Sequence, residues 1–214
     1  MNLNLACPFY SHAETSPERS GLRVDGIDYT YGELALRASA IATRLRESIP
    51  AGPKRVVILG ARSWESYAAL LGVCWSGAAY VPVNSKLPVS RISEILRIIE
   101  PDALLVDEDG ARAAAGLPEL ARLMVYRVRD IEPSPVCQEP LQVDAEDPAY
   151  ILFTSGSTGV PKGVAIAFRG VAMFLSAMAK RFPLTPEDRS GQPCELSFDI
   201  SVSNIFTAWV PRDP

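Results

Sequence analysis

Two spacings of apolar residues alternate along most of this chain. Residues 55–60 and 103–106 form short, continuous apolar runs, which are typical of parallel strands covered on both faces. Residues 88–100 follow another pattern, in which apolar side chains recur every three or four positions, as on one face of a helix. Strands that alternate with helices predict an α/β fold with mainly parallel sheets and flanking helices.

Local signals predict the remaining elements. Asp25-Gly26 interrupts an alternation of apolar and polar residues over 23–29, which predicts a β-hairpin. Thr30 and Glu33, three positions apart, form a capping-box pattern at the start of a helix. We expect further helices at 63–76, 111–122 and 169–182, and further strands at 77–83 and 123–128. On the last of these helices one apolar face is expected to pack in the core, with Met173 as core filler; the residues of that face are Val171, Phe174, Leu175 and Met178.

Residues 131–148 differ in composition from the chain on either side. They are acidic, rich in proline and without clear periodicity, which is typical of a linker or an exposed loop. We therefore expect a first α/β subdomain over residues 1–130, then this linker, and the start of a second, incomplete subdomain over residues 149–214.

A Ser/Thr/Gly loop lies between two apolar runs, 150–153 and 164–168. We expect both runs to be buried strands that hold the loop from Ser155 to Lys162 as an exposed tip. Its glycines can adopt positive φ and bring bare backbone N–H groups close to an anion, while four hydroxyl side chains and one lysine add donors and charge. This composition predicts a polyanion-binding loop.

A simpler interpretation of the same loop stays open, because Ser/Thr/Gly segments are often only surface turns with a solvated lysine. The spacing does not fit a Walker A loop, since Lys162 follows Gly159 by three residues and leads into a strand instead of a helix. The sequence therefore argues against a P-loop kinase or GTPase.

The ten residues 154–163 resemble the signature loop of the adenylate-forming (AMP-binding) superfamily. This superfamily includes amino-acid adenylation domains of nonribosomal peptide synthetases, D-alanine:carrier-protein ligases, acyl-CoA synthetases and luciferases. Residues 30–34, 77–83 and 198–202 resemble three further signatures in the same order. The chain looks most like the N-terminal part of the large domain of a peptide-synthetase adenylation domain or a D-alanine ligase.

The resemblance implies an ATP- and Mg²⁺-dependent ligase. Such an enzyme activates a carboxylic acid as an acyl-adenylate and transfers it to a carrier-protein phosphopantetheine or CoA thiol, and residues 149–214 would begin its nucleotide- and substrate-binding subdomain. Lys162 is implied as the catalytic residue that stabilises charge on the phosphates as pyrophosphate leaves. The implied ATP-binding residues are Thr154, Ser155, Gly156, Ser157, Thr158, Gly159, Lys162 and Gly163.

A second candidate position is Asp199, between Phe198 and Ile200, after an expected apolar strand and before an expected helix. By resemblance, Phe198 and Asp199 bind the substrate, and the carboxylate pairs with the α-ammonium group of an amino acid. A carboxylate half-buried between apolar residues would suit such a cation. Asp199 or Ser201 could instead only cap the next helix.

Composition limits the partners. The 214 residues carry a formal charge of -4, so no excess of basic residues favours nucleic acid. Four scattered cysteines without a C-x-x-C pair and one histidine predict no metal site formed by these residues. With no signal-like start and no 18-residue apolar span, we expect a protein of the reducing cytoplasm without a membrane segment.

Members of the superfamily continue well beyond the Pro-Arg-Asp-Pro end of this chain. We expect a truncated chain with an apolar surface exposed where the remaining part, in the same protein or as a separate chain, would dock. Three functions stay open: an amino-acid adenylation module, an inactive remnant or nucleotide- or partner-binding module, and a fragment of an acyl-CoA synthetase.

Overall fold

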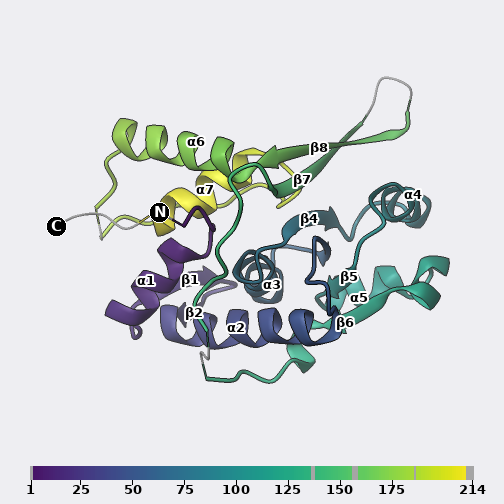
Figure 1. The fold of residues 1–214 in the computed structure, drawn as a ribbon, viewed down its shortest axis with the longest axis horizontal. Helices are drawn as coiled ribbons and strands as arrows, with labels where there is room; N and C mark the ends of the chain where they lie inside the picture. The colour runs from purple at the N-terminus through teal and green to yellow at the C-terminus, as the bar shows by residue number, and fades with distance from the viewer. Residues whose placement is uncertain (1, 136–137, 156–158, 186, 211–214) are drawn as a thin grey trace.

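The computed structural model describes residues 2–135, 138–155, 159–185 and 187–210. Over these ranges the centre of the molecule is a six-stranded sheet with the order β6-β5-β3-β4-β7-β8 (Figure 1). Every neighbouring pair is parallel except β7 and β8, which are antiparallel. The predicted α/β class with a mainly parallel sheet and flanking helices is therefore confirmed. The strands are β3 (Arg55–Gly60), β4 (Ala79–Asn84), β5 (Ala103–Val106), β6 (Met124–Arg127), β7 (Pro148–Ser155) and β8 (Pro161–Ala167).

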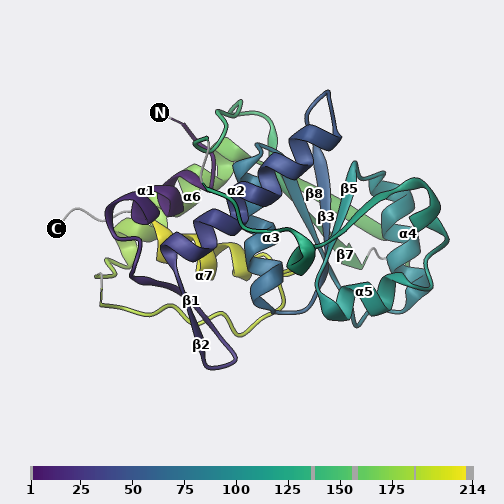
Figure 2. The ribbon, with the colours of Figure 1, turned by 90° about the horizontal axis from the view of Figure 1, so that it is seen from below.

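Helices cover both faces of this sheet. Figure 2 shows α4 and α5 together at one end of the molecule and α1, α6 and α7 at the other. No helix of the described ranges is long and apolar enough to cross a membrane. The helices are α1 (Cys7–Thr15), α2 (Tyr31–Ser48), α3 (Trp64–Trp75), α4 (Val89–Ile99), α5 (Glu108–Ala114), α6 (Phe168–Arg181) and α7 (Ile200–Trp209).

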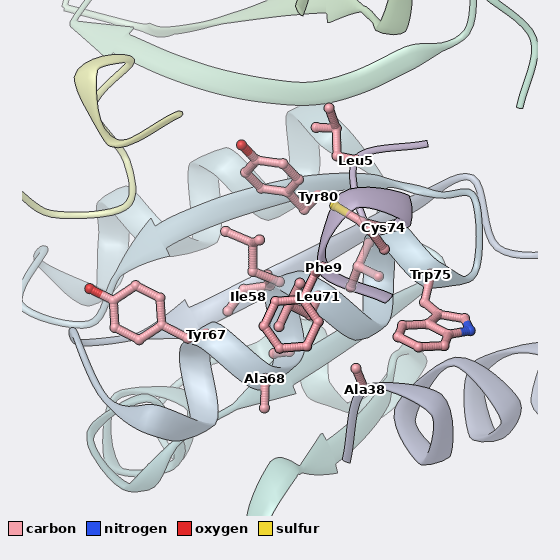
Figure 3. Packing of buried hydrophobic residues seen from close by; sticks show 14 of the residues in the cluster. Leu5, Phe9, Ala38, Ile58, Tyr67, Ala68, Leu71, Cys74, Trp75 and Tyr80 are labelled. Carbon is pink, nitrogen blue, oxygen red and sulfur yellow. The ribbon is translucent and has the colours of Figure 1, made fainter. Parts of the chain in front are cut away.

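Alternate side chains of the central strands belong to two separate cores. In β3, Val56 and Ile58 join the larger core, which also contains side chains of α1, α2, α3, α6 and α7. Val57 and Leu59 point to the other face and pack with α4 and α5. Figure 3 shows the larger core around Phe9 and Tyr80. Burial on both faces explains why β3 is apolar at consecutive positions.

The N-terminal hairpin and the helix that follows it form as predicted. β1 (Ser20–Val24) and β2 (Ile27–Thr30) are antiparallel, and Asp25 and Gly26 have φ of 51° and 80° in the turn between them. The Thr30 side chain accepts a hydrogen bond from the Glu33 backbone N–H, and the Glu33 carboxylate accepts one from the Thr30 N–H. This reciprocal pair starts α2.

The helix predicted over 111–122 is wrong in its extent. α5 begins earlier, because the Asp107 carboxylate accepts a hydrogen bond from the Gly110 N–H at 2.7 Å and caps it. It ends at Ala114, and a separate 3-10 helix, η1 (Pro118–Arg122), follows. The break is explained by Gly116 and Pro118, which do not favour a continuous helix.

Two predictions of burial are also wrong. β8 is the edge strand, and most of it is exposed, including Val164 at 42%. On α6, Met173 and Phe174 were expected in the core but are 67% and 44% exposed, because the buried positions of this helix are Phe168, Val171 and Leu175.

The sheet continues through the two predicted domain boundaries. β7 comes after the proline-rich segment but pairs with β4 through Tyr80 and Tyr150, so residues from both sides of that segment share one sheet. Before it, a second 3-10 helix, η2 (Val128–Asp130), follows β6. The division into 1–130, 131–148 and 149–214 stays a prediction.

Candidate functional site

The predicted anion-binding loop lies at the end of the β7–β8 hairpin. The two arms pair from Pro148 with Ala167 to Ser155 with Pro161, and they extend beyond the body of the molecule (Figure 1). Thr154 stands opposite Lys162, and the Thr154 hydroxyl donates a hydrogen bond to the Lys162 carbonyl oxygen at 3.4 Å. Two predicted site residues are therefore neighbours on adjacent strands.

The chemistry of the hairpin end fits the predicted role. Thr154, Ser155 and Lys162 are exposed, so two hydroxyls and one ammonium group are open to solvent. Gly159 has φ of +82°, which confirms the positive φ expected for this glycine. The predictions for Gly156, Ser157 and Thr158 fall outside the described residues. Hydroxyls, a lysine and a permissive backbone together suit a phosphate group.

Gly163 has a packing role in this hairpin. A Cβ atom at this position would lie 3.2 Å from the Phe153 ring and 3.3 Å from Cγ2 of Ile151. Phe153 is the cross-strand partner of Gly163. The absence of a side chain therefore lets the two arms pair closely, and its predicted role in ATP binding stays a prediction.

Sequence reasoning missed one residue at the hairpin end. Arg91, on α4, donates a hydrogen bond from Nη1 to the Gly159 carbonyl oxygen at 2.5 Å. The same Nη1 lies 3.0 Å from Oε2 of Glu94. The arginine is 68 residues before the glycine, so no local pattern indicates this contact.

The surroundings of Asp199 differ from the prediction. Phe198, Asp199 and Ile200 are all exposed, so the expected half-burial of the carboxylate is wrong. The expected strand before it is also wrong, since residues 191–199 contain only turns, bends and irregular backbone. The Asp199 carboxylate accepts a hydrogen bond from the Ile200 N–H at 2.8 Å, so Asp199 caps the start of α7, and its predicted role in substrate binding stays a prediction.

The charge of Asp199 nevertheless affects the pKa of Tyr150, a residue of β7. Burial raises the pKa of the Tyr150 phenol, and the negative charge of Asp199 raises it further. Tyr150 packs on Tyr80 with ring centroids 5.5 Å apart, and Tyr80 packs on Phe206 of α7 at 6.2 Å. Asp199, at the start of α7, therefore acts near the beginning of β7, whereas Thr154 and Ser155 lie at the other end of that strand, with Lys162 opposite them on β8.

The segment before α7 also contacts the carboxyl ends of two parallel strands. Glu195 and Ser197 line a small cavity together with Gly60 at the end of β3 and Asn84 at the end of β4. Ligands of open α/β sheets bind at this edge. β7 runs parallel to β4, so the hairpin end lies beyond the same edge. Residues 195–197 and the hairpin end therefore lie at the same edge of the sheet.

A cleft of about 680 Å³ lies elsewhere, between the β1–β2 hairpin, α7 and residues 184–192. Its walls include His12, Arg62 and Trp209. None of the described residues predicted to bind ATP or substrate lines it. Size alone therefore does not identify the site.

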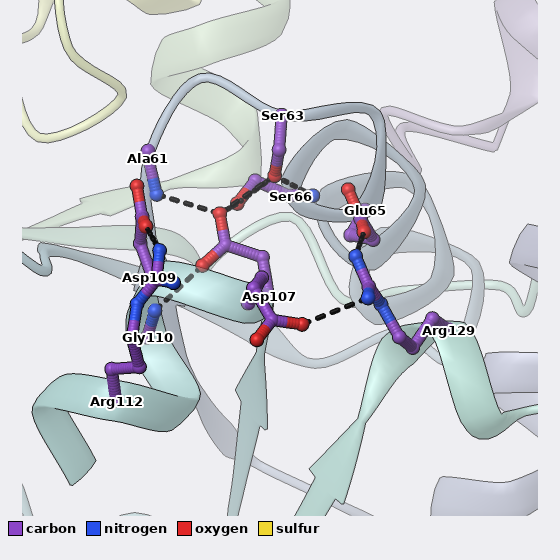
Figure 4. A network of polar contacts seen from close by, with 10 residues as sticks. Ala61, Ser63, Glu65, Ser66, Asp107, Asp109, Gly110, Arg112 and Arg129 are labelled. Atoms are coloured by element: carbon purple, nitrogen blue, oxygen red, sulfur yellow. Dashed lines mark hydrogen bonds and ion pairs between the residues drawn. The ribbon is translucent and has the colours of Figure 1, made fainter.

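A second polar cluster, around Asp107 and Arg129, stabilises the fold. Asp107 is buried and accepts hydrogen bonds from the Ala61 N–H at 2.8 Å and the Ser63 hydroxyl at 2.7 Å (Figure 4). Arg129 forms ion pairs of 2.8 Å with buried Glu65 and with Glu108. These carboxylates already have partners within the fold. Among the described residues, no group of three or more His, Cys, Asp or Glu side chains gathers to hold a metal ion.

Comparison with known proteins adds an independent observation. The family model described as "AMP-binding enzyme" matches residues 9–210. The dimodular nonribosomal peptide synthase of Bacillus subtilis (strain 168) is 34% identical over 202 residues, which cover 92% of this chain and 8% of that protein.

The solved structures that resemble this chain also include a nonribosomal peptide synthetase and an adenylation domain. The AMPPNP-bound form of the nonribosomal peptide synthetase FmoA3 has a TM-score of 0.87 and 30% identity, over 98% of this chain and 22% of that one. The Vibrio cholerae adenylation domain AlmE, in complex with glycyl-adenosine-5'-phosphate, has a TM-score of 0.83 and 25% identity, over 98% of this chain and 44% of that one. The chain spans less than half the length of each of these three relatives.

Proposed function

This chain belongs to the AMP-binding enzyme family, and we propose that it takes part in the ATP-dependent activation of an amino acid. ATP supplies the adenylyl group that the substrate carboxylate receives, giving an acyl-adenylate and pyrophosphate. The thiol of a carrier-protein phosphopantetheine or of CoA then loses its proton and attacks the acyl carbon, and a thioester forms as AMP leaves. The relatives described above are synthetases and adenylation domains of this kind, one of them in complex with a glycyl-adenylate.

The end of the β7–β8 hairpin carries this proposal. Its exposed Ser155 hydroxyl is available to donate a hydrogen bond to a phosphate oxygen, and the Thr154 hydroxyl could do so by giving up its long, 3.4 Å bond to the Lys162 carbonyl oxygen. Gly159, with its positive φ, allows the backbone to approach an anion closely. Lys162 would stabilise the negative charge that develops on the phosphates as pyrophosphate leaves, which is why we assign it the catalytic role. The remaining assigned ATP-binding residues are Gly156, Ser157, Thr158 and Gly163.

We assign the substrate's ammonium group to Asp199. Its carboxylate is exposed at the start of α7, and only one bond to the Ile200 N–H is needed for the cap, so further acceptor capacity is open to a cation. Phe198 is 58% exposed beside it and would contact the apolar part of the substrate. A substrate without an ammonium group would form no ion pair with Asp199, which is why we favour an amino acid over a fatty or aryl acid.

Mg²⁺ enters the proposal only as a counter-ion of the ATP phosphates. The described residues gather no cluster of metal-ligating side chains, and no step above depends on a metal held by the protein. We propose that the parts of the relatives to which this chain does not correspond supply the rest of the site, in the same protein or as a separate chain. The cytoplasmic location stays a prediction, in keeping with the free thiols of Cys7, Cys74 and Cys194.

Amino-acid-dependent ATP–pyrophosphate exchange by the purified chain tests the proposal, with ATP binding followed separately. Lys162→Ala should lower the exchange rate by about 10²-fold or more, as for the loss of other groups that stabilise developing charge. Lys180→Ala is the matched control, because Lys180 is also exposed but lies in the last turn of α6. It should leave the rate unchanged.

The outcomes separate the three functions that the sequence leaves open. Exchange that depends on an amino acid and on Lys162 supports the proposal, whereas exchange that depends on a fatty or aryl acid favours an acyl-CoA synthetase fragment. ATP binding by a folded chain without exchange favours either a chain that needs the rest of the site, or a nucleotide-binding module or inactive remnant, and exchange restored by adding the missing part distinguishes the first from the others. A folded chain that shows neither binding nor exchange overturns the proposal.

A further inference from the structure

Arg91 lies on α4, outside the hairpin that carries the candidate ATP-binding residues, yet it contacts that hairpin directly. We propose that Arg91 is a positioning residue that fixes the Gly159–Val160 peptide group at the end of the β7–β8 hairpin. The importance of Arg91 for ATP binding rests on the proposed function, whereas its contact with Gly159 is observed independently of that function.

The arginine is held from three directions. The apolar face of α4, with Ile92, Ile95, Leu96 and Ile99 buried, anchors the helix against the sheet and thus fixes the Arg91 backbone. Glu94, one turn further on, pairs with the guanidinium at 3.0 Å. The third partner is the Gly159 carbonyl oxygen at 2.5 Å. The Arg91 side chain is only 24% exposed, so these contacts replace most of its contact with water.

A bond to this carbonyl oxygen orients a backbone donor as well. The peptide group is planar, and none of the described peptide bonds is cis, so the Gly159 C=O and the Val160 N–H point in opposite directions. With the C=O directed at Arg91 on α4, the Val160 N–H is directed away from that helix. Gly159, at φ of +82°, permits this orientation of the chain without a side-chain clash.

The electrostatics favour an indirect role over direct contact with phosphate. The positive charge of Arg91 is already paired with Glu94, and the Nη1 donor is shared with Gly159. A guanidinium donor gives a stronger hydrogen bond to a carbonyl than a neutral one does, so the contact can hold a glycine that would otherwise rotate freely. Arg91 therefore acts on the candidate ATP site through the backbone.

Backbone NMR of the isotopically labelled chain without nucleotide tests the contact directly. In Arg91→Ala, the amide order parameters of Gly159 and Val160 should fall from the range of an ordered backbone to below about 0.6. Arg91→Lys keeps the positive charge and offers an ammonium donor on a shorter side chain, so it should restore part of the order. Arg97→Ala is the matched control, because Arg97 lies on the same helix but is paired with Glu119. It should leave both amides unchanged.

ATP titration of the same variants tests the consequence. Arg91→Ala should weaken ATP binding by about tenfold, the effect of losing one charge-assisted hydrogen bond, and Arg97→Ala should not. Unchanged order parameters at Gly159 and Val160 in a folded Arg91→Ala chain overturn the inference. If that variant does not fold, Glu94→Gln, which removes the ion pair that orients Arg91, should lower the same order parameters, and no change there counts against the inference.

The two proposals can fail separately. If the wild-type chain binds no ATP but Arg91→Ala loosens Gly159 and Val160, the positioning role stands and the proposed function falls. If the wild-type chain binds ATP and Arg91→Ala changes neither the order parameters nor the affinity, the proposed function stands and the positioning role falls.

Discussion

At the scale of single residues, the sequence predicted the chemical groups of the loop, but it did not predict which other residues surround each of them in the fold. Gly159 and the exposed donors Thr154 and Lys162 follow from the composition of one loop, and the structure has them as expected. The exposure of Asp199 could not be predicted, because apolar neighbours in sequence do not have to be buried neighbours in space. Arg91 could not be found either, since its partner Gly159 is brought to it only by the fold.

The link between Asp199 and Tyr150 gives a prediction at this scale. Asp199→Asn should lower the raised pKa of the Tyr150 phenol but not return it to its ordinary value, because burial is the larger cause and remains. Asparagine caps a helix about as well as aspartate, so the start of α7 should persist. The pKa is measured by following the ¹³Cζ shift of labelled tyrosine against pH.

The sign of the stability effect follows from the same shift. A phenol whose pKa is raised by folding contributes stability that is fully present below the unfolded pKa of about 10 and is lost as the pH rises through the folded value. Because Asp199→Asn lowers the folded pKa of Tyr150, this stability should be lost at a lower pH in the variant than in the wild type. Glu47→Gln, an exposed change on α2, is the control. An identical Tyr150 pKa in wild type and Asp199→Asn would show that the two groups are not coupled.

At the scale of elements, start signals were predictable and the effects of tertiary packing were not. The capping box of Thr30 and Glu33 is visible as a four-residue pattern and forms as expected. The early start of α5 depends on Gly110, whose Cβ would lie 1.8 Å from the Leu59 carbonyl oxygen of β3, and no helical periodicity encodes that contact. The exposure of β8 is similar, because an apolar run does not reveal which strand ends a sheet.

The capping box itself gives the prediction for elements. Thr30→Ala should lower the free energy of unfolding by about 1 kcal/mol, because the Glu33 N–H loses its acceptor at the start of α2. Urea denaturation measures this loss. Glu47→Ala, exposed near the end of the same helix, should change stability by less than about 0.5 kcal/mol. Equal stability of Thr30→Ala and wild type would mean that packing alone fixes where α2 begins.

At the scale of the whole molecule, exposed apolar side chains are concentrated in the later part of the chain. The sequence resemblance led us to expect such a surface, and the class of fold and the order of its strands and helices were also predictable from their alternation. Which side chains form the surface was not, since Met173 and Phe174 had been expected in the core. The exposed apolar residues of this part are Val160, Val164, Met173, Phe174, Phe182, Phe198 and Ile200.

This surface predicts self-association of the chain. An apolar edge strand beside an apolar helix face is a site at which other chains can pair or pack. Val164→Lys places a charge on β8, and it should shift sedimentation velocity profiles toward the monomer at concentrations where the wild-type chain associates. The driving force is the burial of apolar area, so added sulfate should strengthen association of the wild type.

Leu36→Lys is a matched control for this experiment. Leu36 is 37% exposed and Val164 is 42% exposed, but Leu36 lies on α2, which packs with α1 and α3. Equal loss of association in both variants would mean that net charge, and not this surface, controls the behaviour. A wild-type chain that stays monomeric at every concentration and in sulfate would show that the exposed apolar side chains do not form an interaction surface.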